Sequence, residues 1–348
     1  MIELIEVEHS YGSTQVLQKV SLRLETGQVG CVLGESGCGK TTLLRCIAGF
    51  ETISGGEIRT EHKLLSSVGQ HVAAEQRRIG MVFQDYALLP HLTVLQNVAF
   101  GLHELGSAER TKRSRDMLER VRLQEMAQRY PHELSGGQQQ RVAIARALAP
   151  QPDLLLMDEP FSNLDGAMRN RLGEEVRELL NALGATALIV THDHHDAFAM
   201  SDVAGVLHRG ALRQWSRTYD LYHSPADRYV ADFVGRGAWL GGVVRGAGEI
   251  ETSLGTFSGQ LRESCADGTR VQLLLRPDDV IHVDDSDLRA TVLSRRFRGS
   301  DYLYELLLSD GQRLLSLVPS HHDHAVGETI GIRINPLHLV AFPDESSG

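Results

Sequence analysis

Long hydrophobic runs are missing from this 348-residue sequence. The longest apolar stretches are short ones, such as residues 154–157. A helix that crosses a membrane needs about 20 consecutive apolar residues. We therefore expect any association with a membrane to go through a partner protein.

Positive charge is also scarce, because 35 Lys and Arg residues stand against 45 Asp and Glu residues, a formal net charge of −10. This balance disfavours nucleic acid as the main partner, since binding to its backbone needs a basic surface. The opening residues, MIELIEVEHSYGSTQ, carry acidic side chains where a secretory signal would carry positive charge and an apolar core. We expect the protein to stay in the cytosol.

Cysteines are few, and Cys31, Cys38, Cys46 and Cys265 include no Cys-x-x-Cys pair. A large cytosolic chain does not need disulfides for stability. We predict that these four residues are small buried side chains rather than metal ligands or disulfide partners.

What is present indicates two domains. The length exceeds the roughly 100–200 residues of one compact domain, and the hydrophobic content of 42% is ordinary for globular proteins. After about residue 235 the pattern changes to short strands separated by Gly and Asp-Gly turns. We predict one domain over residues 1–235 and an all-β domain over residues 236–348. The linker is expected near residues 234–242, which hold four glycines.

The first domain has the pattern of an α/β fold. A buried strand over residues 29–33 leads through a Gly-rich turn into a helix over residues 41–48. Strands over residues 154–157 and 187–190 flank an amphipathic helix over residues 169–183. Strand, helix and strand in this order predict a parallel pair with a crossover.

Residues 34–41, GESGCGKT, fit the G-x-x-x-x-G-K-[ST] pattern of a phosphate-binding loop between a strand and a helix. Glycines let backbone N–H groups converge on a phosphate, and the helix start adds partial positive charge. Lys40 balances phosphate charge, and Thr41 is placed to bind Mg²⁺. The alternative is a chance glycine turn with a surface lysine. The predicted ATP-binding residues of this loop are Gly34, Glu35, Ser36, Gly37, Cys38, Gly39, Lys40, Thr41 and Thr42.

An acidic pair, Asp158 and Glu159, follows the apolar run at residues 154–157. ATP hydrolysis needs a carboxylate near the metal and another near the attacking water. We predict that Asp158 holds Mg²⁺ and that Glu159 polarises the water. The plainer alternative is a solvated acidic turn at the end of a strand.

The run LSGGQQQR at residues 134–141, upstream of the acidic pair and Pro160, resembles the signature motif of ATP-binding-cassette (ABC) ATPases. Tyr11 resembles the family's aromatic residue that stacks on adenine, and Gln84 resembles the Q-loop glutamine. Residues 162–165, SNLD, resemble the D-loop, and His192 resembles the switch histidine. Taken alone, Gln84 could be a turn glutamine and His192 a structural histidine.

The resemblance implies a P-loop ATP-binding-cassette domain with a helical subdomain, and a C-terminal all-β domain of the OB-like (TOBE) kind. ATP and Mg²⁺ are the implied cofactors. The implied catalytic residues are Glu159, His192 and Gln84, and the implied metal-binding residues are Thr41, Gln84 and Asp158. Tyr11 joins the ATP-binding residues, Asp165 belongs to the D-loop, and the signature residues acting in trans are Ser135, Gly136, Gly137 and Gln138.

The signature residues precede a helix and so form a second anion-binding helix terminus. One γ-phosphate needs only one such cradle. By resemblance to the family, the second cradle serves the nucleotide of another copy, which implies a homodimer with shared sites. The family also implies transmembrane permease subunits, an indirect periplasmic solute-binding protein, and a peripheral location on the cytoplasmic face of the inner membrane.

Several residues depart from the family pattern or suggest sites of their own. Glu35 must point away from the phosphates, and Asn163 replaces a frequent Ala in the D-loop and is expected to modify the dimer contact. We predict surface salt bridges for Arg141 and Arg146, with pairing to a phosphate as the alternative. His194 and His195 are expected to face solvent. The histidines of the run HHDH, which are His321, His322 and His324, are predicted to form a hydrated turn rather than a metal site.

Two segments of the C-terminal domain resemble each other at an offset of 59 residues. Residues 268–277 and 280–283 correspond to residues 327–336 and 339–342. Each half is too small to hold a core alone, so we predict that the two pack together. Coincidence between two strands that end in proline is the alternative.

The most consistent function is an ATPase that drives a solute importer. Ferric iron is the first choice of cargo, on the resemblance of residues 43–51, 129–135 and 143–150 to the ferric-iron importer ATPases. Phosphonate, sugar, polyamine and sulfate importers share nearly all of these residues. A soluble, non-transport cassette ATPase is less favoured, because the chain has one P-loop and no long heptad run. A P-loop kinase would leave residues 134–138 unexplained.

Overall fold

The computed structural model describes residues 1–246, 248–258, 260–261, 265–336 and 338–344. The chain divides into two compact units, Met1–Thr218 and Tyr219–Gly348. This division, between Thr218 and Tyr219, falls before the predicted domain boundary after residue 235.

The first unit begins with a five-stranded antiparallel sheet in the order β2-β1-β4-β5-β6. Strands β1 and β2 form a hairpin in which Tyr11 faces Thr14. The bounds are β1 Ile2–Tyr11, β2 Thr14–Leu24, β4 Gly55–Thr60, β5 Leu64–Ser67 and β6 Gln70–His71, followed by the short helix η1 Ala74–Gln76.

A six-stranded sheet in the order β11-β10-β3-β9-β8-β7 forms the centre of this unit. All neighbouring pairs are parallel except β10 and β11. The predicted strands at residues 154–157 and 187–190 are β8 and β9, and their parallel pairing is confirmed. The bounds are β3 Val29–Leu33, β7 Ile79–Val82, β8 Leu154–Asp158, β9 Ala187–Thr191, β10 Val203–His208 and β11 Ala211–Arg217.

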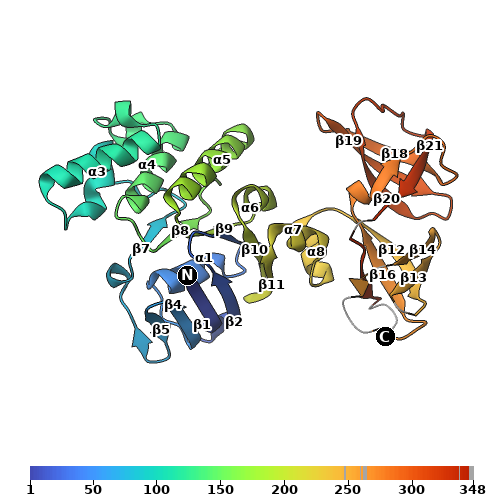
Figure 1. Cartoon of the computed structure of the whole chain (residues 1–348), viewed down its shortest axis with the longest axis horizontal. Coiled ribbons are helices and arrows are strands. Elements are labelled where there is room, and N and C mark those ends of the chain that lie inside the picture. The colour runs from blue at the N-terminus through green and yellow to red at the C-terminus, as the bar shows by residue number, and fades with distance from the viewer. Residues whose placement is uncertain (247, 259, 262–264, 337, 345–348) are drawn as a thin grey trace. The chain divides into compact units, whose positions relative to one another are not determined.

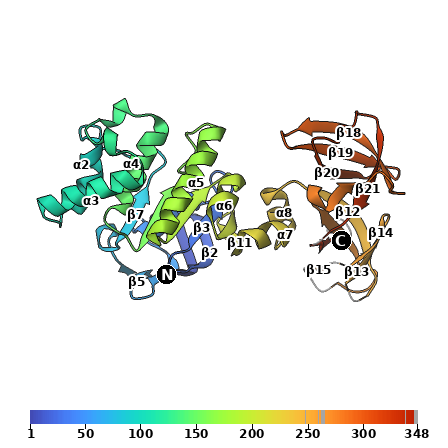
Figure 2. The same cartoon turned by 45° about the horizontal axis from the view of Figure 1, so that its top comes forward.

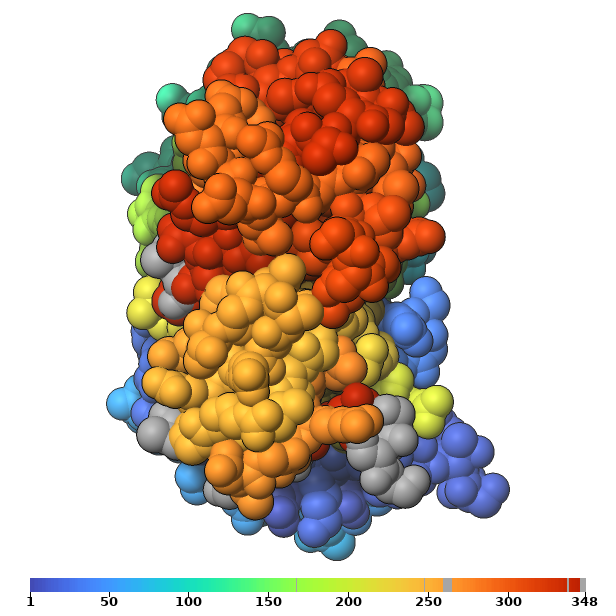
Figure 3. Space-filling model, turned by 90° about the vertical axis from the view of Figure 1, so that its right-hand side faces the viewer, coloured from blue at the N-terminus to red at the C-terminus, as the bar shows by residue number. Residues whose placement is uncertain are grey.

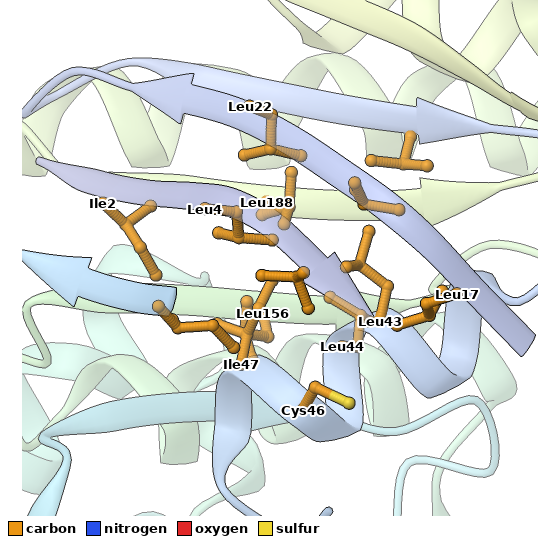
Figure 4. Packing of buried hydrophobic residues seen from close by; sticks show 14 of the residues in the cluster. Ile2, Leu4, Leu17, Leu22, Leu43, Leu44, Cys46, Ile47, Leu156 and Leu188 are labelled. Atoms are coloured by element: carbon orange, nitrogen blue, oxygen red, sulfur yellow. The ribbon is translucent and has the colours of Figure 1, made fainter. Parts of the chain in front are cut away.

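Helix α1 (Lys40–Ala48) packs its apolar face against strands of both sheets, as Figure 4 shows. Its side chains Leu43, Leu44 and Ile47 have no exposed surface. Each fully buried side chain of this size contributes about 1.5–3 kcal/mol relative to an exposed one. The core therefore holds the start of α1 firmly at the end of β3. Strand residues of the same core include Ile2, Leu4, Leu17, Leu22, Leu156 and Leu188.

A group of helices, visible in Figures 1 and 2, follows β7 in the chain. Buried Asn97 organises its start: the side-chain Oδ1 accepts from Leu89 N at 2.9 Å, and Nδ2 donates to the carbonyls of Leu89, Leu92 and Thr93. The bounds are α2 Val94–Ala99, η2 Phe100–Leu102, α3 Ser107–Arg120, η3 Gln124–Met126, η4 Pro131–Glu133 and α4 Gly136–Leu148.

Helices α5 (Gly166–Leu183) and α6 (His194–Met200) complete the first unit. The helix predicted over residues 169–183 is α5, which begins three residues earlier. The reason is its cap, since the Asp165 side chain accepts from Met168 N at 2.9 Å.

The described residues of the second unit form two short α-helices, a 3-10 helix and two β-sheets. One sheet has the order β14-β13-β12-β16-β22-β15 and the other β17-β21-β18-β19-β20. Figure 3 shows one face of this unit, with its earlier strands in yellow and orange and its last strands in red. The bounds are α7 Thr218–His223, α8 Arg228–Val234, β12 Ala238–Val244, β13 Glu249–Thr252, β14 Gly255–Ser258, β15 Gln260–Leu261, β16 Arg270–Leu275, η5 Pro277–Asp279, β17 Val280–His282, β18 Arg289–Phe297, β19 Asp301–Leu308, β20 Arg313–Pro319, β21 Thr329–Ile334 and β22 Val340–Pro343.

The linker predicted over residues 234–242 is wrong, because most of it is the strand β12, which pairs with β13 and β16. Three of the four glycines serve close packing, because a Cβ on Gly235, Gly237 or Gly242 would lie within 2.7 Å of a neighbouring side chain, whereas a Cβ on Gly241 would meet nothing within 4 Å. A Cβ on Gly242 would lie 2.6 Å from Ile250 Cγ2 and 2.9 Å from Leu273 Cδ1, so only glycine fits between these buried side chains.

Arg276 explains why α8 and most of α7 belong to the second unit. The side chain is 3% exposed and donates hydrogen bonds to the carbonyls of Tyr222 (3.1 Å), Ala231 (3.1 Å) and Gly235 (2.7 Å). Burial lowers the pKa of this guanidinium. The bonds attach both helices to the end of β16.

The strands of the two similar segments in this unit pair with each other. The first strand of the first segment, β16, pairs with β22, and the second, β17, pairs with β21. Buried residues of both segments belong to one core, including Val271, Leu273, Ile330 and Ile332. The prediction that the segments pack together is confirmed.

Candidate functional site

Four predicted motifs follow four neighbouring strands of the parallel sheet. Lys40 follows β3, His192 follows β9, Glu159 follows β8 and Gln84 follows β7, and these strands are adjacent in the order β3-β9-β8-β7. The carboxyl ends of parallel strands lie at the same edge, which is where α/β proteins bind their ligands. The fold therefore gathers residues from distant parts of the chain at one edge.

The phosphate-binding loop is shaped by its glycines. Gly37 and Gly39 have φ angles of +82° and +111°, in the region that favours glycine. A Cβ on Gly34 would lie 2.4 Å from the Leu207 carbonyl oxygen, so this position also needs glycine. The side-chain amine of Lys40 is buried and donates to the carbonyls of Gly34 (2.8 Å) and Glu35 (2.9 Å). The loop thus wraps around its own lysine.

The start of α1 is suited to an anion. Its first turn contains no acidic residue, and no side chain caps it. Its first amide groups consequently lack a side-chain acceptor, and an anion at a helix N-terminus supplies one. Glu35, Ser36 and Gly37 are exposed beside it. These features fit a phosphate.

The side-chain oxygens of Thr41 and Asp158 lie close together beside this loop. The Thr41 hydroxyl donates to Asp158 Oδ1 at 3.2 Å. Burial raises the pKa of Asp158, and the hydrogen bond from Thr41 works in the opposite direction. A hydroxyl and a carboxylate are ligands that suit Mg²⁺. These two residues therefore fit the implied metal ion.

Glu159 sits in a backbone conformation that is unusual for its type. Its φ is +41°, and its amide donates to the Val190 carbonyl at 2.9 Å across to β9. The same residue's Oε2 lies 3.2 Å from His192 Nδ1, within hydrogen-bond distance. Left-handed backbone in a non-glycine residue is costly and clusters at functional sites. The turn after β8 aims Glu159 at the histidine after β9.

The D-loop contacts the Q-loop within the same chain. Asn163 Nδ2 donates to the Gln84 carbonyl at 3.0 Å, and Ser162 Oγ donates to the Glu159 carbonyl at 3.0 Å. Gln84 is exposed, so its amide is open to solvent. Asn163 thus links two motifs of its own chain, and its expected effect on a dimer contact stays a prediction.

The signature residues Ser135–Gln138 begin α4, where Gln138 Oε1 accepts from Ser135 N at 2.9 Å. A Cβ on Gly137 would lie 3.0 Å from Met168 Sδ on α5, which favours glycine there. Figures 1 and 2 show α4 in the group with α2 and α3 rather than beside α1. Across the part of the chain that the structure describes, no hydrogen bond joins these residues to the phosphate-binding loop.

Arg146 does not form the predicted surface salt bridge. Its Nη1 and Nη2 atoms donate to the carbonyls of Ala87 (2.6 Å) and Tyr86 (2.9 Å), which follow Gln84. Both residues have left-handed backbone, with φ of 64° and 44° for Tyr86 and Ala87. Burial lowers the pKa of Arg146. For Arg141 the prediction is confirmed by an ion pair with Glu175 on α5.

The Arg146 bonds give a first testable prediction. Arg146→Met removes both donors, so we expect the free energy of unfolding to fall by about 1–3 kcal/mol. Urea denaturation measures this change. Arg171→Met is the matched control, because the Arg171 side chain is 76% exposed and its pair with Glu175 is weak. Equal stability of the two variants would contradict a structural role for the Arg146 contacts.

Tyr11 and the cysteines match their predicted environments in most respects. Tyr11 is 45% exposed, as expected for a residue that contacts a base, and its hydroxyl donates to Glu51 Oε1 at 3.1 Å. Cys31, Cys38 and Cys46 are buried as free thiols, and burial raises the pKa of Cys46 to about 12. The exception is Cys265, which is only partly buried.

Two predictions about histidines are wrong in part. His195 is exposed, but His194 is half-buried against Phe198, and burial lowers the pKa of His194. The run HHDH is not simply a hydrated turn either. His322 and His324 lie against His282, about 40 residues earlier in the chain, whereas His321 is exposed and outside this group. Burial and the neighbouring histidines lower the pKa of His282. Spacing along the chain could not reveal this third member.

A cavity of about 1050 Å³ opens at the other edge of the parallel sheet, where Asp153 and Thr186 precede β8 and β9. None of the predicted nucleotide-binding residues lines it. This cavity is therefore separate from the candidate site. Among the described residues, no helix is long and apolar enough to cross a membrane.

Comparison with known proteins decides the family. Residues 17–162 match the ABC transporter family, and residues 273–342 match the TOBE domain. The chain is 39% identical over 340 residues to the spermidine/putrescine import ATP-binding protein PotA 1 of Pseudomonas aeruginosa, with 92% of this chain and 90% of that protein covered. The chain belongs to the ABC transporter family.

Other similar proteins agree with this assignment. The ABC transporter ATPase is 42% identical over 272 residues to the sulfate/thiosulfate import ATP-binding protein CysA 2 of Chromobacterium violaceum, covering 78% of this chain and 73% of that protein. Among solved structures, cbiO1 of Clostridium perfringens matches with a TM-score of 0.57 and 28% identity over 63% of this chain and 89% of that one.

A solved dimer of the ATP-binding cassette MJ0796, bound to ADP and Pi, matches the ABC transporter ATPase with a TM-score of 0.54 and 32% identity. It covers 63% of this chain and 99% of that one. The predicted fold class, an α/β cassette with a C-terminal all-β TOBE domain, is confirmed.

Proposed function

We propose that this ABC transporter ATPase hydrolyses ATP to drive a solute importer, as a homodimer on permease subunits at the cytoplasmic face of the membrane. The observation that carries the proposal is the gathering of Lys40, Thr41, Asp158, Glu159 and His192 at one sheet edge. A periplasmic binding protein would supply the solute to the permease. The names of the relatives, which are import ATP-binding proteins, support the importer role.

Binding begins with charge complementarity at the phosphate-binding loop. The first amides of α1 and the ammonium group of Lys40 are both positive, and the triphosphate of ATP is negative. Lys40 is held by two carbonyls of its own loop, so it is positioned beside the helix start. The exposed Tyr11 ring offers a surface on which the adenine can stack.

Thr41 and Asp158, with Gln84, are the residues that would hold Mg²⁺. When bound, this ion neutralises charge on the phosphate oxygens and favours attack by water. The burial of Asp158 strengthens its electrostatic interactions with a cation.

Glu159 is the proposed general base. Its carboxylate would accept a proton from the attacking water at Oε1 or Oε2 as the water oxygen bonds to the γ-phosphorus. The bond from the γ-phosphorus to the bridging oxygen would break at the same time, and ADP would leave with that oxygen. His192 lies within hydrogen-bond distance of Oε2 and orients this carboxylate. The Glu159 carbonyl accepts from Ser162, so the D-loop keeps the turn in place.

The second phosphate cradle, Ser135–Gly137, would act on the nucleotide of the other copy. It starts α4 in the helical group and makes no described hydrogen bond to its own phosphate-binding loop. The dimeric form of the related cassette MJ0796 supports pairing of two copies. Each ATP would then bridge two chains, and its hydrolysis would release them.

Ser135→Arg tests this arrangement. A bulky cation at the start of α4 should abolish hydrolysis by the dimer and leave ATP binding to the monomer unchanged. Phosphate release and equilibrium ATP binding measure the two properties separately. Ser107→Arg, at the exposed start of α3, is the control for added bulk and charge. Equal loss of ATP binding in the Ser135→Arg monomer would place Ser135 in its own site and overturn the shared-site proposal.

Polyamine is the cargo that the comparisons favour. The similarity to the polyamine relative extends over 92% of this chain, whereas the sulfate relative matches 78%. Neither of these relatives is named for ferric iron, so the ferric-iron prediction has no support from them. Uptake of labelled spermidine should fail in a strain lacking the gene and return with the wild-type gene but not with the Glu159→Gln form. Loss of sulfate or iron uptake instead would identify another cargo, and loss of none would favour a non-transport ATPase.

A further inference from the structure

Three histidines of the second unit meet although they are distant in the sequence. His282 ends β17, and His322 and His324 lie in the turn between β20 and β21. One ring nitrogen from each lies within 4.8 Å of the other two. The ring centroid of His282 is 4.8 Å from that of His322 and 4.6 Å from that of His324. All three side chains are half-buried or more, so this is a built cluster rather than a loose surface tract.

The turn that carries two of these rings is held by the sheet beneath it. Tyr304 is fully buried on β19, where its hydroxyl donates to the His322 carbonyl at 2.7 Å and accepts from His324 N at 3.0 Å. Arg295 on β18 forms an ion pair with Asp323 and donates to the His324 carbonyl at 3.0 Å. The backbones of His322 and His324 are thus held in place by contacts that do not involve either ring.

His324 has one ring nitrogen engaged and the other left without a partner. Nδ1 lies 2.8 Å from Glu328 Oε1, while the other oxygen of Glu328 accepts from Ala325 N at 2.8 Å. A ring that donates from Nδ1–H to a carboxylate keeps its lone pair on Nε2. That Nε2 atom is buried and has no hydrogen-bond partner among the described residues. A buried unpaired acceptor is costly, and a bound cation would satisfy it.

We propose that His282, His322 and His324 bind one divalent transition-metal ion, with Zn²⁺ as the fitting example, and that Glu328 orients the His324 ring. Imidazole nitrogens suit zinc and its neighbours, whereas Mg²⁺ and Ca²⁺ prefer oxygen ligands. Zn–N bonds of about 2.0–2.1 Å put tetrahedral nitrogens about 3.3 Å apart. The three ring nitrogens lie within 4.8 Å of one another, so they need to approach by up to about 1.5 Å. Asp284 Oδ1 is 3.3 Å from His282 Nε2 and can serve as a further ligand or as a partner of His282.

Metal binding at this place would join two parts of the second unit. His282 ends β17, and the other two ligands follow β20. These are the end strands of the sheet order, and they contact each other, with Ser316 Oγ on β20 donating to the Val280 carbonyl on β17. The ion would therefore link the turn after β20 to β17 and stabilise the folded unit. The ATP site contains none of these residues, so this site is a separate one.

Zinc titration of the full chain tests the proposal. We expect one Zn²⁺ per chain whose affinity falls at least about 100-fold in His282→Ala and His324→Ala, because each variant removes a ligand. Glu328→Gln should weaken binding by about 10–100-fold, as expected for loss of a carboxylate that orients a ligand. His321→Ala is the matched control, since His321 is exposed in the same histidine run and lies outside the cluster. It should bind Zn²⁺ like the wild type.

Two further readouts separate loss of a ligand from loss of folding. Thermal unfolding without metal should be similar for His322→Gln and the wild type, and added Zn²⁺ should raise the melting temperature of the wild type only. Co²⁺ should give the intense visible absorption of a tetrahedral site in the wild type and not in His324→Ala. The proposal would be overturned if His321→Ala lost binding as much as His324→Ala, or if His282→Ala and His324→Ala each bound Zn²⁺ as tightly as the wild type.

Discussion

Glu159→Gln is expected to lower the rate of ATP hydrolysis at least about 100-fold and to leave ATP bound, because a positioned general base contributes about 10²–10⁴-fold. The amide has nearly the shape of the carboxylate but cannot hold the proton of the attacking water. ATP would therefore persist between two chains, and the variant should become a stable dimer when ATP and Mg²⁺ are added. Phosphate release and size-exclusion chromatography measure the two effects.

A matched variant keeps this test specific. Glu174→Gln changes an exposed carboxylate on α5 and should hydrolyse ATP at the wild-type rate. The assignment of the base is wrong if Glu159→Gln also hydrolyses ATP at that rate. The hydrolysis rate of His192→Ala should lie between the rates of Glu159→Gln and Glu174→Gln. The variant keeps the Glu159 carboxylate but removes the ring within hydrogen-bond distance of it.

Lys40→Ala is expected to weaken ATP binding by about 10–100-fold, since a hydrogen bond to a charged group is worth about 1.5–3 kcal/mol. The substitution removes the ammonium group that balances the phosphates. It also leaves the carbonyls of Gly34 and Glu35 without their donor, so the loop loses order. Equilibrium binding of a fluorescent ATP analogue measures the loss.

Lys63→Ala is the control for Lys40→Ala. Lys63 is exposed in the turn between β4 and β5. Its described hydrogen bonds are those in which its backbone carbonyl accepts from the amide and the hydroxyl of Thr60. Its loss should not change ATP affinity. Comparable affinity in Lys40→Ala and the wild type would mean that Lys40 does not contact the phosphates.

The sequence predicted which motifs lie together at the carboxyl-end edge of the parallel sheet, because local patterns determine their positions. Buried apolar runs indicate β3, β8 and β9, and a polar motif follows each of them. Parallel pairing then places the motifs at one edge without further information. The predicted start of α5 is three residues late. The Asp165 side chain caps the helix through a hydrogen bond, and apolar periodicity carries no information about such a bond.

Contacts between distant residues escaped prediction for a physical reason. Arg146 and Arg276 donate to backbone carbonyls, which carry no mark in the sequence, so an arginine in such a role looks like one at the surface. His282 joins His322 and His324 only through strand pairing. The glycines near residue 240 suggested a linker, but Gly242 lies in the strand β12, where it makes room for neighbouring side chains. The roles of the nucleotide-binding residues stay predictions until variants are measured.

A crystal structure of Glu159→Gln with ATP and Mg²⁺ tests the central claim most directly. The account predicts a two-fold dimer in which each γ-phosphate lies between Lys40 of one chain and Ser135 of the partner subunit. A single chain that encloses its ATP with its own Ser135 would contradict it.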